Sequence, residues 1–377
     1  MNQKRLDYLD MVKGFGIFLV VLGHMEDIST ATRVWISSVH MPLFFVVTGI
    51  LMAVKNEPDR FELKEIVYKK YRGVIIPYLW FSLSYFIIDI ANCWIIKNID
   101  LRTFIVDTVS SATFYGQSVL WFLPAMFLAS VGFVILKKKL PDKITVVLIY
   151  IFAIFAYVIK NFLAKVYDSY ADSLIITSLI NVVYIFLRAV IAQSFIGSGY
   201  FAKKICDKIT GVYESEDKHN NSKKDVLIRL FNKPYSFIPG LVLLAVNIPI
   251  AMMNECADLR NILLNNIALY YVAALTGCFG IILIIKSLPV IKPITYYGRN
   301  SMIVMAAHVN YYFLYAGIRL AWVVDSVNKH AKHYVFVAVV IATVFALCTV
   351  VIEIINRWFP FVLGRKSPKT KGLQKNN

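Results

Sequence analysis

The sequence lacks the signatures of most soluble enzyme classes. It contains no P-loop, no GxGxxG dinucleotide fingerprint and no GxSxG nucleophile elbow. Its longest hydrophilic segment, about 203–236, has some 34 residues and is charged, which is too short for a folded catalytic domain. Any chemistry must therefore be done by the apolar remainder of the chain.

Cysteine chemistry and secretion signals are also missing. The five cysteines, at positions 93, 206, 256, 278 and 348, have no paired spacing, so we expect neither a disulfide framework nor a metal site. The first apolar run follows Lys4 and Arg5 like a signal peptide, but no small-residue cleavage site comes after it. We therefore expect this run to remain as the first helix.

Apolar residues dominate what is present. They make up 58% of the 377 residues, and the mean hydropathy is +0.63. No alternation typical of a β-barrel is visible, so the sequence predicts an all-α polytopic membrane protein with one membrane-embedded domain over residues 1–356. We expect ten helices, at 8–27, 34–54, 74–96, 118–136, 144–160, 174–201, 237–253, 263–285, 296–322 and 334–355.

The basic residues predict the orientation. With the N-terminus inside, the cytoplasmic segments carry 28 Lys and Arg and the opposite segments carry 8. This asymmetry predicts a multi-pass protein of the cell inner membrane with both termini in the cytoplasm. It also accounts for most of the +17 net charge, so we expect membrane lipids rather than nucleic acid as partners. Residues 357–377 are predicted to be a basic, disordered tail.

Two ionisable residues lie inside the first predicted helix. Lys13 and His24 are eleven residues apart, so they share one helix face and differ by about 16 Å in height. Ionisable side chains at membrane depth indicate a functional site. Asp10 precedes Lys13 by three residues on the same face, and we expect the two to pair.

Five segments, read together, resemble one family. The first helix, RLDYLDMVKGFGIFLVVLGHM, is followed in order by VHMPLFFVVTGILM, KKYRGVIIPYLWF, LWFLPAMF and GRNSMIVMAAHVNYYF. This series is similar to membrane acyltransferase family 3, whose hallmark is Arg or Lys, ten residues, then His. The resemblance covers residues from about 5 to 315, and Thr48 stands where the family usually has serine.

The resemblance implies transfer of an acyl group, usually acetyl from cytoplasmic acetyl-CoA, to a hydroxyl of an envelope carbohydrate or glycolipid. His24 would be the general base, because imidazole accepts a proton near neutral pH. Asp10 and Lys13 would support it. Lys69 and Arg72, one turn apart before the third helix, would bind the phosphates of the donor.

Four further residues are candidates for substrate binding: His40, His308, Arg188 and Trp121. Arg188 is expected to line a polar cavity, and the other three have structural alternatives. Histidines within membrane helices also form hydrogen bonds between helices, and tryptophans also pack or lie at the membrane interface. Lys69 and Arg72 likewise suit a topology signal.

Two other functions suit a ten-helix bundle with interior charges. One is a transporter or exporter of a sugar or polysaccharide, and the other is a non-catalytic partner in envelope assembly. Transport would be favoured by an inverted repeat, which the two halves do not show. The assembly role leaves the Lys13–His24 face unexplained, so acyl transfer is the preferred interpretation.

Overall fold

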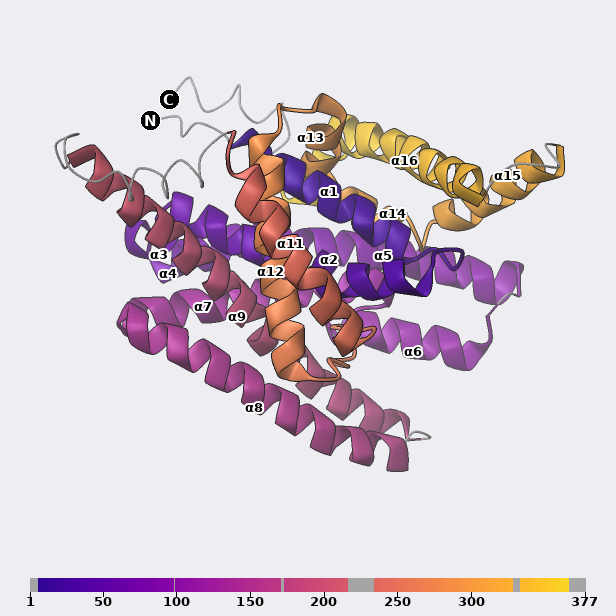
Figure 1. Ribbon diagram of the computed structural model, residues 1–377. Coiled ribbons are helices and arrows are strands. Elements are labelled where there is room, and N and C mark those ends of the chain that lie inside the picture. Colours follow the sequence, from indigo (N-terminus) through magenta and orange to yellow (C-terminus); the bar gives the residue numbers. More distant parts are fainter. Residues whose placement is uncertain (1–5, 98, 171–172, 216–233, 328–332, 366–377) are drawn as a thin grey trace, which may run out of the picture. The chain divides into compact units, whose positions relative to one another are not determined.

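The computed structural model describes residues 6–97, 99–170, 173–215, 234–327 and 333–365 (Figure 1). Within these ranges the chain is helical and has no strand, only an isolated bridge between Asp258 and Leu263. Eight of the described helical segments are long and apolar enough to cross a membrane. The predicted all-α polytopic membrane fold is therefore confirmed.

The chain forms two compact units. The first comprises residues 1–61, 136–154 and 191–301, and the second comprises 62–135, 155–190 and 302–377. Two long helices, α8 (Asp142–Ser169) and α9 (Leu174–Ser215), contribute residues to both.

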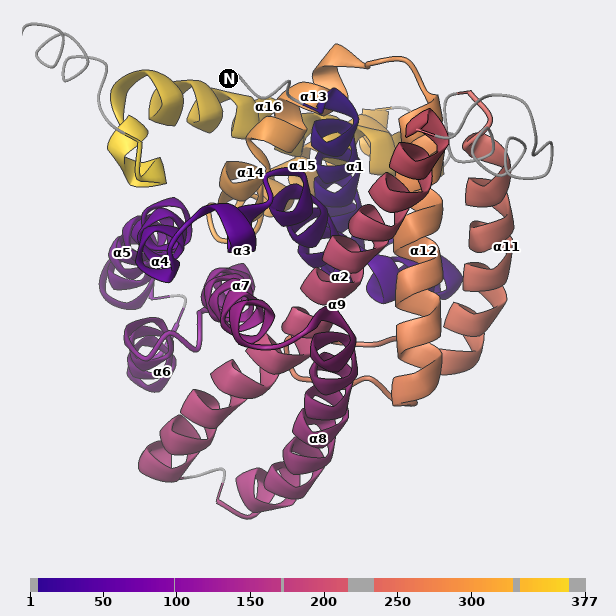
Figure 2. The ribbon, with the colours of Figure 1, turned by 90° about the vertical axis from the view of Figure 1, so that its left-hand side faces the viewer.

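The remaining helices of the first unit are α1 (Asp7–Gly23), α2 (Thr30–Val54), α3 (Glu57–Arg60), α11 (Phe237–Asn254), α12 (Ile267–Ser287) and α13 (Lys292–Arg299). Helices α11 and α12 lie side by side (Figure 2), and α1 packs against α2 and α13. These contacts bury much of α1.

Two glycines allow the close approach of α1 to α13. A Cβ atom at Gly14 would lie 2.0 Å from the carbonyl oxygen of Ile294, and one at Gly298 would lie 1.7 Å from that of Asp10. No larger residue fits at either position, so the two backbones touch. This contact brings Arg299, the last residue of α13, to the start of α1.

The second unit contains α4 (Leu63–Lys70), α5 (Ile76–Ile90), α6 (Leu101–Ala112), most of α7 (Phe122–Lys139), nearly all of α14 (Ser301–Ala307), α15 (Phe313–Val327) and α16 (His333–Trp358). Two π-helical turns, η1 (Tyr71–Ile75) and η2 (Ala91–Ile95), flank α5. The 3₁₀ turns η3 (Ser118–Trp121) and η4 (Pro360–Leu363) lead into α7 and follow α16. Helices α15 and α16 pack together.

Side-chain caps explain several differences from the predicted boundaries. Helix α2 begins at Thr30 rather than at 34, because the Ser29 side chain accepts a hydrogen bond from the Thr32 amide. Asp100 caps α6 in the same way, within a segment predicted to be a loop. Asn266 caps α12, which therefore starts at 267 instead of 263.

The predicted ninth helix, 296–322, is wrong as one continuous element. It is divided into α13, α14 and α15 by a break at Asn300 and a turn over 308–312. Tyr312 adopts a left-handed φ of 60°, and the Leu314 amide bonds to the carbonyl of His308, so the chain leaves the helical path there.

Three further boundaries differ. Helix α1 ends at Gly23 rather than at 27, which makes His24 its C-cap residue. The sixth predicted helix continues as α9 to Ser215, so the first part of the expected loop 203–236 is helical, and residues 216–233 lie outside the described residues. The expected tail starts with ordered structure through η4, whereas 366–377 lie outside the described part of the chain.

Candidate active site

An ionic cluster holds the start of α1. Lys13 Nζ lies 2.7 Å from Asp10 Oδ1, so the expected pairing of these residues is confirmed. Arg299 reaches the other oxygen of Asp10 at 3.2 Å and also bonds Asp7 at 2.9 Å. Asp10 is buried, and two cations compensate the cost of burying its carboxylate. Among the described residues, the ion pairs of this cluster join two carboxylates, Asp7 and Asp10, to two cations, Lys13 and Arg299.

Sequence reasoning missed Arg299. It follows Gly298 in the segment GRNS. The resemblance of this segment to the acyltransferase family gives no reason to single out the charge of Arg299. The contact with Asp10 spans 289 positions of the sequence, so no local spacing rule identifies it.

His24 stands at the opposite end of α1, where its side chain is exposed. Its Nδ1 lies 2.8 Å from the carbonyl oxygen of Val20. A carbonyl can only accept a hydrogen bond, so Nδ1 carries the proton and Nε2 carries the lone pair of the neutral ring. The imidazole is therefore held in the tautomer that a general base acting through Nε2 requires.

His40, on α2, shares this region of the first unit. It lies within electrostatic range of His24, and its Nδ1 is 2.7 Å from the carbonyl oxygen of Ile36. Asp258 and Arg260 also lie within electrostatic range of His24. The structure thus brings both predicted histidines into one polar region, whereas Lys13 stays about 16 Å away along the helix.

A second residue that sequence reasoning missed, Arg33, fastens the turn after His24. Its guanidinium Nη2 donates to the carbonyl oxygens of Met25 and Glu26, each at 3.1 Å. These bonds fix the backbone that follows the imidazole. No motif in the sequence distinguishes a charge that binds carbonyls from one that faces solvent, so sequence reasoning does not single out Arg33.

The two expected donor-binding residues lie in the second unit. Lys69 is exposed on α4, and Arg72 is half-buried in the π-helical turn η1. Arg72 Nη2 donates to the carbonyl of Gly364 at 2.6 Å, and its guanidinium lies 5.8 Å from the ring centroid of Tyr68. Arg72 therefore binds the C-terminal segment. It is also the residue expected to bind the phosphates of the acyl donor.

Arg188 and Trp121 are brought together in the second unit. Arg188 is 1% exposed, and its Nη1 donates to the carbonyl of Tyr115 at 2.9 Å. Its guanidinium carbon lies 4.1 Å from the ring centroid of Tyr115 and 5.6 Å from that of Trp121. This arrangement ties α9 to the segment between α6 and α7, so both residues have a structural role beside the expected substrate contact.

His308 is fully buried at the end of α14. Its Nδ1 lies 3.0 Å from the carbonyl of Val304 and 2.8 Å from that of Met305. The ring thus caps the last turn of a short helix. His308 and the residues of the α1 region belong to different units, so the structure groups the predicted site residues into two sets.

Comparison with known families accounts for nearly the whole chain. Residues 6–355 match the family described as "Acyltransferase domain". No curated protein and no solved structure matches the sequence. The match covers both units and every candidate residue of the site, so the resemblance found in five sequence segments is confirmed. The chain belongs to this acyltransferase family, and with its apolar helices it is a multi-pass membrane acyltransferase.

Proposed function

We propose that this protein transfers an acyl group, acetyl in the first instance, from acyl-CoA to a hydroxyl of a cell-envelope carbohydrate or glycolipid. The observation that carries the proposal is His24, an exposed imidazole whose Nδ1 is held by its own helix. Acyl transfer to a hydroxyl requires a base close to neutral pH, and this ring is set to act through Nε2.

In the proposed step, His24 Nε2 takes the proton of the acceptor hydroxyl as its oxygen attacks the thioester carbonyl. A bond forms between this oxygen and the acyl carbon, and the bond between that carbon and the sulfur of CoA breaks. The imidazolium then returns the proton to the leaving thiolate, so no other reactant is needed. His40, which lies within electrostatic range of His24, is proposed to contact the same substrate.

Lys13 and Asp10 support this chemistry from a distance. Because Lys13 and Arg299 both pair with the buried Asp10 carboxylate, we assign this cluster the task of anchoring α1, and with it His24, rather than that of attracting phosphate. Lys69 and Arg72 are proposed to bind the phosphates of the donor at the cytoplasmic surface of the inner membrane. This assignment is supported by the basic character of the segments predicted to be cytoplasmic.

The test uses purified full-length protein, radiolabelled acetyl-CoA and a His24→Ala variant. We expect thioester loss or transfer to fall by about 10²–10⁴-fold in the variant, with donor binding retained. His333→Ala, at an exposed histidine that begins α16, is the matched control and should keep donor binding and most of the turnover. If the folded wild type neither binds nor turns over acetyl-CoA, the transporter interpretation takes precedence.

A further inference from the structure

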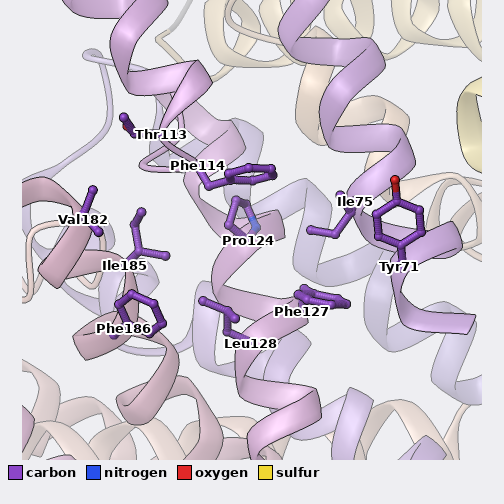
Figure 3. Close-up of a pocket in the computed structure, with 10 residues that line it drawn as sticks. All are labelled: Tyr71, Ile75, Thr113, Phe114, Pro124, Phe127, Leu128, Val182, Ile185 and Phe186. Carbon is purple, nitrogen blue, oxygen red and sulfur yellow. The ribbon is translucent and has the colours of Figure 1, made fainter. Parts of the chain in front are cut away.

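An apolar cavity lies between η1, α7 and α9 of the second unit (Figure 3). Its volume is about 350 Å³, which falls within the ~300–1,000 Å³ typical of ligand sites. Figure 3 shows Ile185 and Phe186 of α9 on one side, Tyr71 and Ile75 of η1 on the other, and Phe127 of α7 between them. The cavity is large enough for a ligand rather than for a few water molecules.

The lining of this cavity is almost free of polar groups. Among the residues that form it, only Tyr71 and Thr113 have a polar side-chain atom, and none is charged. Thr113 Oγ1 donates to the carbonyl of Val109 at 2.8 Å, so its proton is used at the end of α6. A ligand here is therefore held by the burial of hydrocarbon surface and not by hydrogen bonds along its length.

The cavity opens at membrane depth. Val182 and Phe186, on its α9 side, are 37% and 55% exposed. The helical segments that form it, Leu63–Ile95, Ser118–Lys139 and Ile175–Ile209, are all long and apolar enough to cross a membrane. Exposed apolar side chains of such segments face the hydrocarbon core of the bilayer. The molecules available at this opening are therefore lipid acyl chains.

Tyr71 gives the cavity one polar end. Exposed apolar side chains of its segment extend from Leu79 to Ile95, about 24 Å along the helix, which is close to the ~30 Å thickness of a hydrocarbon core. Tyr71 precedes Leu79 by eight residues, or about 12 Å, and is half-exposed, so it lies at the level of the lipid head groups. At this level its hydroxyl can donate to the ester carbonyl of a phospholipid.

Phe114 presents its ring to the cavity in a strained conformation. Its φ of 62° lies in the left-handed region, which is unfavourable for a bulky residue. The ring stacks on that of the buried Tyr78 at 5.2 Å between centroids and is still 38% exposed. Strain of this kind persists where the surrounding structure imposes it, and it indicates a functional contact for the ring.

We propose that the second unit holds a membrane phospholipid as a bound ligand, with one acyl chain in this cavity and its ester groups beside Tyr71. The second chain stays in the bilayer, and the lipid is neither donor nor acceptor of the proposed acyl transfer. The chain packs against Phe114, so it supports the segment between α6 and α7. The same segment carries Tyr115, whose carbonyl binds Arg188.

The probe is dioleoyl phosphatidylcholine, added to delipidated full-length protein in detergent and followed by native mass spectrometry. A neutral head group avoids simple attraction by basic residues. We expect one lipid to remain bound after gel filtration. Val182→Trp fills the cavity from its α9 side, so the mole fraction of lipid needed for half occupancy should rise at least about tenfold.

Val183→Trp is the matched control, because this neighbouring valine is 40% exposed and does not line the cavity. It should bind lipid like the wild type. Equal retention by the two variants, or equal loss in both, would overturn the proposal, because the lipid would then lie elsewhere on the surface. If Val182→Trp does not fold, Leu128→Phe fills the cavity from α7 and should weaken retention in the same direction.

Two further measurements test the ends of the ligand. Tyr71→Phe removes only the hydroxyl and should raise the half-saturating mole fraction by about fivefold. Hydrogen exchange over residues 113–117 should be slower with lipid bound in the wild type and unchanged by lipid in Val182→Trp. A selective loss of palmitoyl-CoA binding in Val182→Trp would overturn the assignment, because the cavity would then hold the chain of an acyl donor. We expect no such loss.

Discussion

Two buried charges, one in each unit, have different neighbours. In the first unit, the buried carboxylate of Asp10 is met by two cations, Lys13 and Arg299, at 2.7 and 3.2 Å. In the second unit, the guanidinium of Arg188 is 1% exposed and is met by a backbone carbonyl and the faces of Tyr115 and Trp121. The contacts described for Asp10 are with opposite charges, and those described for Arg188 are with a backbone dipole and aromatic rings.

The two arrangements depend on different properties of their side chains. An ion pair depends on the charge of every member, so the anchor of α1 is lost when its cations are removed. The guanidinium of Arg188 contacts a carbonyl oxygen and two aromatic rings. The strength of these contacts depends on the planar shape of the group as much as on its charge. In the first unit, the position of α1 and of His24 at its end thus depends on the ion pairs of Asp10. In the second unit, the segment between α6 and α7 is held by the shape of the Arg188 guanidinium.

The largest effect is expected from removing both cations of the first unit. In Lys13→Met with Arg299→Met, the buried Asp10 carboxylate loses both of the cations described above. We expect a loss of about 3–5 kcal/mol in the free energy of unfolding. Denaturant titration of the full-length protein in micelles, compared with both single variants, measures this loss.

The control adds Asp10→Leu to the double variant. Because no buried charge is then left, most of the lost stability should return. Asp7→Asn, at a side chain that is 43% exposed, should cost less than about 1 kcal/mol. A triple variant as unstable as the double one would show that packing of the long side chains, rather than charge, holds α1.

A smaller effect is expected in the second unit. Arg188→Met removes the hydrogen bond to Tyr115 and both ring contacts, and we expect it to cost about 2–3 kcal/mol. Hydrogen exchange should rise over residues 113–121, which the guanidinium fastens. Arg188→Lys keeps the positive charge but removes the planar guanidinium. Its loss in the free energy of unfolding should therefore be almost as large as that of Arg188→Met. Full retention of stability by lysine would contradict the shape argument.

The sequence was informative where interactions are local. The spacing of Asp10 and Lys13 predicts their ion pair, because three residues of helix place them on one face. The apolar windows predict the membrane helices, and five short segments indicate the family. Arg299 and Arg33 could not be found this way, since their partners are set by packing of α13 on α1 and by the turn after His24.

The predicted ninth helix shows a second limit of predicting structure from the sequence pattern. Residues 296–322 have helical periodicity and no proline, yet the chain leaves the helix at 308–312. The hydroxyl of Tyr85 on α5 donates to the carbonyl of Ala306, and Ser84 bonds Tyr311 at 2.7 Å, so tertiary partners satisfy backbone and side-chain groups around the break. Such partners override a local preference, and the sequence pattern does not reveal them.

The smallest expected effect distinguishes two roles of Arg72. Gly364 has a φ of 65°, and a Cβ atom there would lie 1.8 Å from the carbonyl oxygen of Arg72. Gly364→Ala should therefore displace η4 and cost about 1 kcal/mol, the penalty of a left-handed φ for a residue with a Cβ atom. If Arg72 binds the donor phosphates, Arg72→Gln should raise the Kd for acetyl-CoA, while Gly364→Ala should leave it unchanged. Equal loss of donor affinity in both variants would mean that Arg72 acts only as the anchor of the C-terminal segment, like Arg188 on its loop.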